Sequence, residues 1–287
     1  MVRTRTTPIR YEERVHFSEL RFPVDADVRD RLDRLEIPFN EFGVDPYGIS
    51  KAYLGPFFQG LKFFFRHYFS VESQGIENVP AHGRAMLIGN HSGGFAIDGA
   101  MVIASQFFEM NPPRLAQGMA EKFLNKLPFA SQITNRLGHL TGLPEHAERL
   151  LADDRLLMVF PEGARGTAKL YKERYSLVGF GSGFMRLAMR MKTPIVPLAF
   201  LGGGEALPTI ANAYSLGRVL GVPYIPVTPW GLAVPIPAKL EICYSAPMHF
   251  EGDGSEDDEV VHGYVEQVRE RISGLIERGR RRRRGEP

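Results

Sequence analysis

Cysteine is almost absent from this sequence, and its scarcity excludes two kinds of architecture. The single cysteine, Cys243, cannot form a disulfide within the chain and leaves no cluster for a structural zinc. It lies in the alternating run 240–244 with no histidine nearby, which is typical of a strand residue and not of a catalytic thiol. His82, His139 and His146 lack metal-like spacing to carboxylates. We therefore predict no metal and no bound cofactor.

The sequence also lacks a long apolar helix. The stretch 219–238 carries no charge over 20 residues, but it holds five prolines, which one regular helix cannot accommodate. We interpret it as an apolar loop. The N-terminal residues Arg3, Arg5 and Arg10 are not followed by the apolar core of a secretory signal. These absences favour a cytoplasmic protein that is associated with membranes only peripherally.

Basic residues are not spread along the chain as they are in a nucleic-acid binder. Six arginines stand near the C-terminus: Arg278, Arg280, Arg281, Arg282, Arg283 and Arg284. Without them, the net charge of +2 becomes −4, so we expect no nucleic acid as a partner. Because such dense like charges repel one another, the tail is expected not to fold.

This tail and the apolar stretch 219–238 predict attachment to an anionic membrane surface. Near such a surface each basic residue contributes about 1 kcal/mol of attraction, which falls off within a Debye length. The uncharged stretch would add a hydrophobic contact. A solvated tail without a partner is the alternative.

What the chain does contain is a regular alternation of strand-like and helical patterns. Its 287 residues, 44% hydrophobic and 24% charged, can bury a sizeable core. Strands are predicted at 71–76, 85–89, 115–119, 137–141, 156–160, 195–201 and 240–244. Helices are predicted at 28–35, 98–109, 122–136, 144–152, 181–191 and 259–278. This alternation predicts an α/β fold with a mixed, largely parallel sheet flanked by helices.

Three parts are expected along the chain: an N-terminal helical extension (1–70), the main α/β domain (71–250) and a C-terminal amphipathic helix with a polybasic tail (251–287). The extension ends in an aromatic-rich stretch, 53–68, whose spacing suits a helix with a broad apolar face. That helix either packs on the core or dips into a membrane.

The segment 90–98, Asn-His-Ser-Gly-Gly-Phe-Ala-Ile-Asp, carries the most informative chemical pattern. It follows an apolar strand and opens a helix, and the small residues after His91 leave its ring open to a ligand. A carboxylate such as Asp98 can hold one tautomer of a histidine and stabilise its imidazolium. Histidine, with an ordinary pKa of about 6.5, is mostly neutral and basic at pH 7. The alternative is a structural histidine beside a glycine turn.

A second motif, Phe-Pro-Glu-Gly-Ala-Arg-Gly at 160–166, also ends an apolar strand. Ligands of α/β sheets usually bind at the carboxyl ends of the strands, which is where Glu162 and Arg165 fall. Gly163 and Gly166 permit a tight loop, and the planar guanidinium of Arg165 suits a phosphate. The alternative is a solvated loop with an incidental ion pair.

In this order the two motifs resemble those of the glycerolipid acyltransferase superfamily. The run Thr-Pro-Ile-Val-Pro-Leu at 193–198 resembles a later motif of the same family, and the resemblance covers about residues 70–250. It implies an acyltransferase catalytic domain within 71–250. Its members acylate glycerol phosphates, lysophospholipids and acylglycerols.

The resemblance also implies roles for individual residues. His91 and Asp98 match the catalytic histidine and aspartate of the family. Glu162 and Gly163 match its acceptor-site Glu-Gly, and Arg165 matches its substrate-binding arginine.

Two departures from the family pattern stand out. Six residues separate His91 from Asp98 instead of four, so the two side chains meet only if the loop at Gly93 and Gly94 folds back. The stretch 137–144 also lacks the arginine with which the family contacts the acceptor's phosphate. The chain is therefore more similar to the branch of monoacylglycerol and diacylglycerol acyltransferases, whose acceptors can be neutral.

The implied reaction moves a fatty-acyl group to a hydroxyl of a glycerolipid or related lipid acceptor. Acyl-CoA or an acyl carrier protein would be the co-substrate, and His91 would act as general base without an acyl-enzyme. Loop N–H groups near Gly93, Gly94 or Gly163 are the candidate donors to the oxyanion.

A basic cluster follows the second motif. Lys169, Lys172 and Arg174 are candidates for contacts with the phosphates of the donor. A solvated surface loop is the alternative for this cluster.

Two other functions stay open. The chain could be a non-catalytic lipid-binding protein of the membrane surface, which the longer His-to-Asp spacing favours, or an acyl-thioester hydrolase in which water replaces the acceptor. Other enzyme classes are not indicated, because the sequence contains no Gly-x-Ser-x-Gly elbow, no P-loop and no complete dinucleotide fingerprint.

Overall fold

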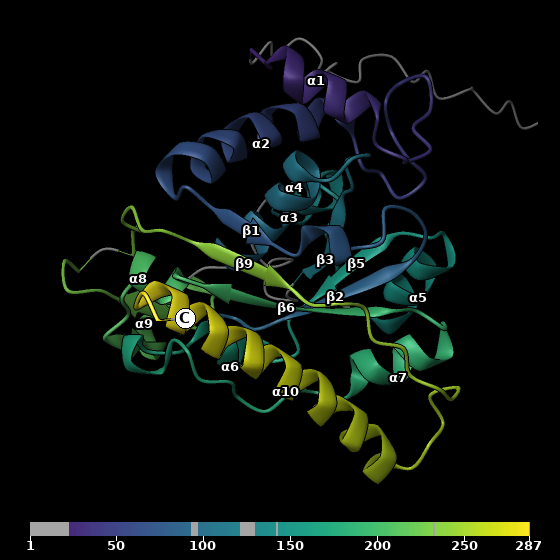
Figure 1. The fold of residues 1–287 in the computed structure, drawn as a ribbon. Helices are drawn as coiled ribbons and strands as arrows, with labels where there is room; N and C mark the ends of the chain where they lie inside the picture. The colour runs from purple at the N-terminus through teal and green to yellow at the C-terminus, as the bar shows by residue number, and fades with distance from the viewer. Residues whose placement is uncertain (1–22, 93–96, 121–129, 142, 232, 287) are drawn as a thin grey trace, which may run out of the picture.

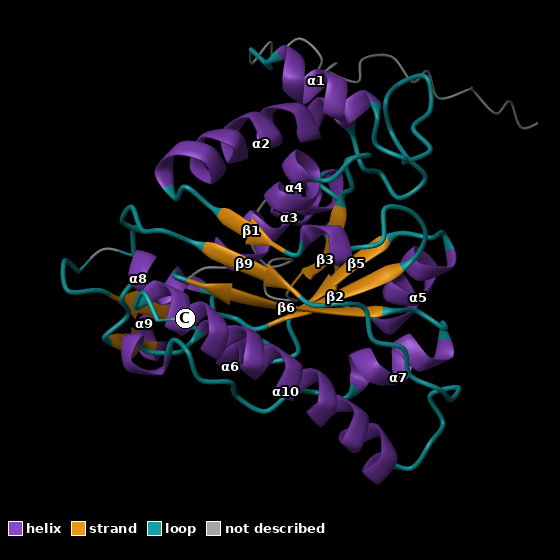
Figure 2. Ribbon diagram, viewed as in Figure 1, coloured by secondary structure: helices purple, strands orange, loops and turns teal. Residues whose placement is uncertain are grey.

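A seven-stranded sheet runs through the middle of the protein (Figures 1 and 2). The computed structural model describes residues 23–92, 97–120, 130–141, 143–231 and 233–286, and within them the strands follow the order β1-β9-β6-β2-β5-β3-β4. Their bounds are β1 Glu72–Gln74, β2 Ala85–Gly89, β3 Ala116–Ala120, β4 Leu140–Thr141, β5 Leu156–Val159, β6 Ile195–Leu201 and β9 Glu241–Tyr244.

The sheet is largely parallel. β4, β3, β5, β2 and β6 form a continuous parallel series, and β9 pairs antiparallel to β6. Each strand falls on a predicted one, and the predicted α/β class with a mixed, mostly parallel sheet is confirmed. β2 and β6 are buried along their whole length, which explains why they read as continuous apolar runs.

The pleat of β2 divides the core into two layers. Leu87 belongs to the cluster on one face of the sheet, whereas Met86 and Ile88 belong to the cluster on the other. The first cluster receives side chains from α1 (Ala26–Asp33), α2 (Lys51–Phe63) and α3 (Ile97–Glu109). The second receives them from α5 (Pro144–Ala152), α7 (Gly183–Arg190) and α10 (Asp258–Arg283). Figure 2 shows these two helical layers above and below the strands.

The aromatic stretch forms α2 and, after it, a π-helical turn, Phe64–Tyr68. Phe58 stacks on Phe107 of α3 with ring centroids 3.6 Å apart, and Phe65 is also buried. Phe63 and Phe64 at the end of the helix are exposed. The N-terminal helices therefore share the core of the sheet, and a short aromatic end stays on the surface.

The C-terminal helix differs from its prediction. α10 continues to Arg283, so the expectation that the arginine tail does not fold is wrong. Arg280, Arg281 and Arg284 lie within 4 Å of Glu277, and Arg282 pairs with Glu241 at the start of β9. These carboxylates offset the repulsion among the arginines. The cationic residues at the end of the helix also complement the helix dipole.

Between β6 and β9 the chain leaves the main sheet, and we call these residues, 202–240, the excursion. Part of it, 219–238, was predicted to be an apolar loop. The excursion contains α8 (Gly203–Ala206), β7 (Ala211–Ala213), α9 (Tyr214–Leu220) and β8 (Ile225–Val227). β7 and β8 form a separate antiparallel pair. The remaining helices are α4 (Ala130–Arg136) and α6 (Ala164–Thr167), and the predicted helical residues 122–129 lie outside the described residues.

None of the helices in the described ranges has the length and hydropathy needed to cross a bilayer.

Candidate active site

One asparagine, Asn90, directly follows β2 and bonds to the backbone of β6 where the chain leaves the sheet. The Asn90 amide donates to the Phe200 carbonyl at 3.1 Å and accepts from the Phe200 N–H at 2.9 Å. The side chain thus takes the place of a peptide group and extends the pairing of β2 with β6 by one step. This frees the backbone of the next residue, His91, to leave the sheet.

His91 and Asp98 meet at the carboxyl end of β2. His91 Nδ1 lies 2.9 Å from Asp98 Oδ2, and the two residues are 8% and 1% exposed. The six-residue spacing therefore does close, because α3 begins at Ile97 and places Asp98 in its first turn. The Ser92 and Gly99 N–H groups also donate to the Asp98 carboxylate, at 3.1 and 2.8 Å.

This arrangement fixes the tautomer of His91. Because Asp98 serves as an acceptor throughout, Nδ1 of His91 is the donor and Nε2 is left as the basic nitrogen. The ring stacks on Phe160, with centroids 4.3 Å apart and planes 18° from parallel. The imidazole is thus held in orientation by a carboxylate on one side and an aromatic face on the other, the geometry of a general base.

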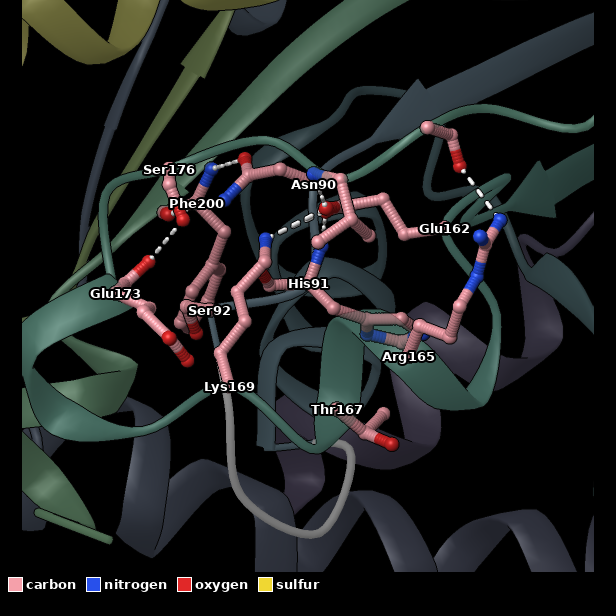
Figure 3. Close-up of polar contacts among 12 residues, drawn as sticks. Asn90, His91, Ser92, Glu162, Arg165, Thr167, Lys169, Glu173, Ser176 and Phe200 are labelled. Carbon is pink, nitrogen blue, oxygen red and sulfur yellow. Dashed lines mark hydrogen bonds and ion pairs between the residues drawn. The ribbon is translucent and has the colours of Figure 1, made fainter. Parts of the chain in front are cut away.

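A buried ion pair holds the backbone of His91 (Figure 3). Glu162 Oε1 accepts from the His91 N–H at 2.9 Å, while Lys169 Nζ donates to the His91 carbonyl at 2.7 Å. Lys169 and Glu162 lie 2.7 Å apart, and the second Glu162 oxygen accepts from the Val178 N–H at 2.7 Å. Burial lowers the pKa of Lys169, while the Glu162 charge acts in the opposite direction. We name these two residues the Glu162–Lys169 pair.

The predicted basic cluster is not a cluster in the folded chain. Lys169 is 3% exposed and its ammonium is bonded to Glu162 inside the site, so the structure does not present it to donor phosphates as the sequence interpretation expected. Arg174 pairs with Glu205 at 3.0 Å and lies over the Tyr171 ring. Lys172 is exposed, and it is the member of the three that still suits a phosphate.

Arg165 and Gly163 occupy the loop that follows β5. Arg165 is exposed, and its guanidinium donates to the Gly179 carbonyl at 3.1 Å. Gly163 has φ +57° and ψ −152°, a conformation that favours glycine. Its N–H donates to the Phe160 carbonyl at 3.0 Å, so it is not free to serve as the predicted oxyanion donor. Gly93 and Gly94, the other predicted donors and substrate contacts, lie outside the described residues.

Gly166 is where the two motifs touch. A Cβ atom at this position would lie 2.6 Å from Glu162 Cβ and 2.8 Å from His91 Cβ. A side chain here would push His91 away from the Glu162–Lys169 pair. The sequence interpretation expected Gly163 and Gly166 to permit a tight loop and a close backbone approach, but it did not identify His91 as the neighbour of Gly166. It also gave no role to Asn90 or Phe160 in orienting His91.

His139 lies in the stretch 137–144, which lacks the arginine that the family resemblance leads us to expect. Its Nδ1 accepts a hydrogen bond from the Gly118 N–H at 3.1 Å, which requires a neutral ring. Burial lowers the pKa of His139 to about 4. This position therefore offers no positive charge near pH 7.

The lowered pKa of His139 predicts a pH-dependent stability. As the pH falls below about 6.5, His139 becomes protonated in the unfolded chain, whereas in the folded chain it becomes protonated only near pH 4. Stability contributed by the neutral ring is therefore lost across this window, by about 1–3 kcal/mol. His139→Asn keeps an acceptor for Gly118 and does not titrate. Urea unfolding at pH 8 and pH 5 should show a smaller pH-dependent loss for this variant than for the wild type; equal losses would contradict the assignment.

Among the described residues, neither the cysteine thiol nor the metal-ligating side chains indicate a second kind of site. Burial raises the pKa of Cys243 to about 12, so the thiol in β9 is protonated and unreactive. Within the described ranges, no group of three or more His, Cys, Asp or Glu side chains is arranged to hold a metal ion.

The fold and site can now be set beside known proteins. The family model described as Acyltransferase matches residues 70–201, which include both motifs and β1 to β6. An uncharacterized protein of Mycobacterium tuberculosis, Rv0502, is 35% identical over 249 residues, 83% of this chain and 68% of that protein. An uncharacterized protein of Mycobacterium leprae, ML2427, is 36% identical over a similar span. This chain belongs to the acyltransferase family.

Two further similarities concern proteins whose names state an activity. The human DGAT1/2-independent enzyme synthesizing storage lipids is 31% identical over 128 residues, 44% of this chain and 38% of that enzyme. The crystal structure of the 1-acyl-sn-glycerophosphate acyltransferase PlsC from Thermotoga maritima superposes with a TM-score of 0.54. It covers 80% of this chain and 82% of that one at 17% identity. The second similarity shows that the α/β fold is shared.

Proposed function

We propose that this protein transfers a fatty-acyl group from an acyl thioester to a hydroxyl of a glycerolipid or related lipid acceptor. The observation that carries the proposal is the buried His91–Asp98 pair, with its basic nitrogen defined and its backbone held by the Glu162–Lys169 pair. Membership in the acyltransferase family supports the reaction class. Acyl-CoA or an acyl carrier protein would serve as donor.

In the proposed mechanism, His91 Nε2 takes the proton of the acceptor hydroxyl as its oxygen attacks the thioester carbonyl. Asp98 stabilises the imidazolium that forms. The tetrahedral intermediate then collapses, the carbon–sulfur bond breaks, and the leaving thiolate takes the proton from His91. An ester and a free thiol are the products, and no acyl-enzyme forms. General-base help of this kind is typically worth about 10²–10⁴ in rate.

A neutral lipid acceptor is the substrate class that the site supports. The stretch 137–144 lacks the arginine that the family resemblance leads us to expect for an acceptor phosphate, and His139 within it is neutral. The name of the human relative, an enzyme synthesizing storage lipids, is in keeping with an acceptor of this kind. Because the acyl chains of such an acceptor keep it in a bilayer, we also propose that the protein works at a membrane surface.

Arg165 is the exposed cation next to the motif, and its replacement tests phosphate recognition. Arg165→Ala is expected to raise the KM for the phosphate-bearing substrate about tenfold, since a charge-assisted hydrogen bond is worth about 1.5–3 kcal/mol. Thermal stability should change little because the side chain is exposed. Steady-state kinetics with Arg29→Ala, an exposed arginine of α1, provide the control. If the KM for the acyl donor and the KM for the acceptor both stay at the wild-type level, Arg165 has no part in binding either substrate.

A thiol-release assay tests the proposed function directly. The purified full chain is incubated with acyl-CoA or acyl carrier protein, with and without monoacylglycerol, diacylglycerol and lysophosphatidic acid. Thiol release is expected to require an acceptor and to match ester formation mole for mole. Equal release without any acceptor would instead identify a thioester hydrolase. No release under any condition would favour a non-catalytic lipid-binding protein, although the closed His91–Asp98 pair removes the spacing argument for that alternative.

A further inference from the structure

The excursion between β6 and β9 carries a concentration of exposed apolar side chains. Of the 15 large hydrophobic residues that are exposed in the described part of the chain, eight fall between residues 210 and 236. We name them the apolar face: Ile210, Tyr214, Leu216, Val219, Leu220, Trp230, Val234 and Ile236. Val219, at 82% exposure, is the most exposed of all. Scattered exposed hydrophobic residues are ordinary, whereas this concentration within one segment is a candidate for an interaction surface.

A second segment extends this surface. The Tyr68 hydroxyl donates to the Pro235 carbonyl at 2.8 Å, which ties the end of the aromatic helix to the excursion. Phe63 and Phe64, the exposed aromatic residues of that helix, lie close to this contact in the sequence. In Figure 1 the end of α2 and the region of α8 and α9 lie along the same edge of the protein, at the left.

The apolar face adjoins the candidate active site. The excursion starts at the carboxyl end of β6, beside the end of β2 from which His91 emerges. It is tied to the loop that carries Lys169, because Asn212 donates to the Ala168 carbonyl at 2.7 Å and the Tyr171 N–H donates to the Thr209 carbonyl at 2.8 Å. The segment that carries the apolar face is therefore bonded to the loop whose Lys169 contacts the backbone of His91.

The charged residues of the excursion indicate which kind of partner it binds. No aspartate or glutamate occurs between residues 206 and 240, whereas the exposed Arg218 does; Lys239 also lies there but pairs with Glu72 at 2.7 Å. Trp230 and Tyr214 are of the type that settles at the boundary between lipid headgroups and acyl chains. This combination of apolar, interfacial aromatic and cationic side chains, with no acid, matches a bilayer surface that contains anionic lipid.

We propose that the apolar face docks on the headgroup boundary of a lipid bilayer and so presents His91 to an acceptor held in that bilayer. The identity of the acceptor rests on the proposed function, whereas docking rests on the surface itself. The exposed Trp230 and Tyr214, together with Arg218 in a segment without acidic residues, favour a bilayer over a second copy of the chain. The arginines of α10 are expected to contribute less to membrane binding than the sequence predicts, because several of them are ion-paired with glutamates.

Vesicle flotation of the full chain tests the docking. The probes are vesicles of phosphatidylcholine alone and of phosphatidylcholine with phosphatidylglycerol. Val219→Ser combined with Leu220→Ser is expected to weaken binding to both vesicles at least about tenfold, because two aliphatic side chains no longer enter the boundary. Trp230→Ser tests a separate part of the face. The matched control is Phe42→Ser combined with Val260→Ser, two exposed hydrophobic residues outside the excursion, and it should bind like the wild type.

Two results would overturn the docking proposal. One is equal vesicle binding by the wild type and the Val219/Leu220 variant. The other is a wild-type dimer in sedimentation equilibrium that this variant loses, which would show a second copy on the face. Transfer to a water-soluble, short-chain acceptor separates the two proposals, since it should be unchanged in the variant. If vesicle binding responds as expected while no protein transfers an acyl group, docking stands and the proposed function fails.

Discussion

Replacing His91 by alanine is expected to lower the rate of acyl transfer by about 10²–10⁴, because in the proposed mechanism its Nε2 takes the proton of the acceptor hydroxyl. We also expect the change to affect the fold. The ring is buried, stacks on Phe160 and donates to Asp98. Its loss leaves Asp98 without one donor, so we expect about 1–3 kcal/mol of destabilisation.

The pair can be tested as a unit. Asp98→Asn is expected to lower the rate by about 10² or more, because the amide carries no charge to stabilise the imidazolium of His91. If the amide oxygen stays on His91 and Ser92, its NH2 group also faces the Gly99 N–H and cannot accept from it. The double variant His91→Ala/Asp98→Asn should be no slower than His91→Ala alone. Rates are compared at a temperature where thermal unfolding shows all three variants folded. More than about a tenth of wild-type activity in His91→Ala would exclude a general-base role.

Replacing Lys169 by methionine is expected to destabilise the protein by about 3–5 kcal/mol, since it leaves the buried Glu162 carboxylate without its counterion. Activity should fall mainly in kcat, because the His91 carbonyl also loses its donor and the ring is held less well. The KM for the acyl donor should hardly change. A rise in KM with kcat preserved would instead support the contact with donor phosphates that the sequence suggested.

Two variants make the Lys169 experiment decisive. Lys172→Met removes an exposed lysine of the same segment and should leave stability within about 0.5 kcal/mol of the wild type. Glu162→Gln combined with Lys169→Met removes both buried charges, and it should recover part of the stability lost in Lys169→Met. Chemical unfolding measures all three. A Lys169→Met protein as stable as the wild type would contradict a buried pair that orients His91.

The sequence alone determined the strands of the seven-stranded sheet and most of the helices, because their signals are local. The apolar runs of β2 and β6 and the pattern of α5 fix element type without any long-range information. The two motifs were also located, since each directly follows such a run. In a largely parallel sheet, the ends of neighbouring strands meet at one edge, and this brings Glu162 to His91.

Only the tertiary structure decided which side chains contact one another in and around the candidate active site. Whether six residues allow Asp98 to reach His91 depends on where α3 begins against the sheet. Lys169 looked like one member of an exposed basic cluster, because composition does not tell whether a lysine side chain turns inward to a buried carboxylate seven residues earlier. The arginine tail folds because Glu241, far away in sequence, lies beside it. Local patterns specify elements, whereas burial and ion pairing depend on chain segments that only folding brings together.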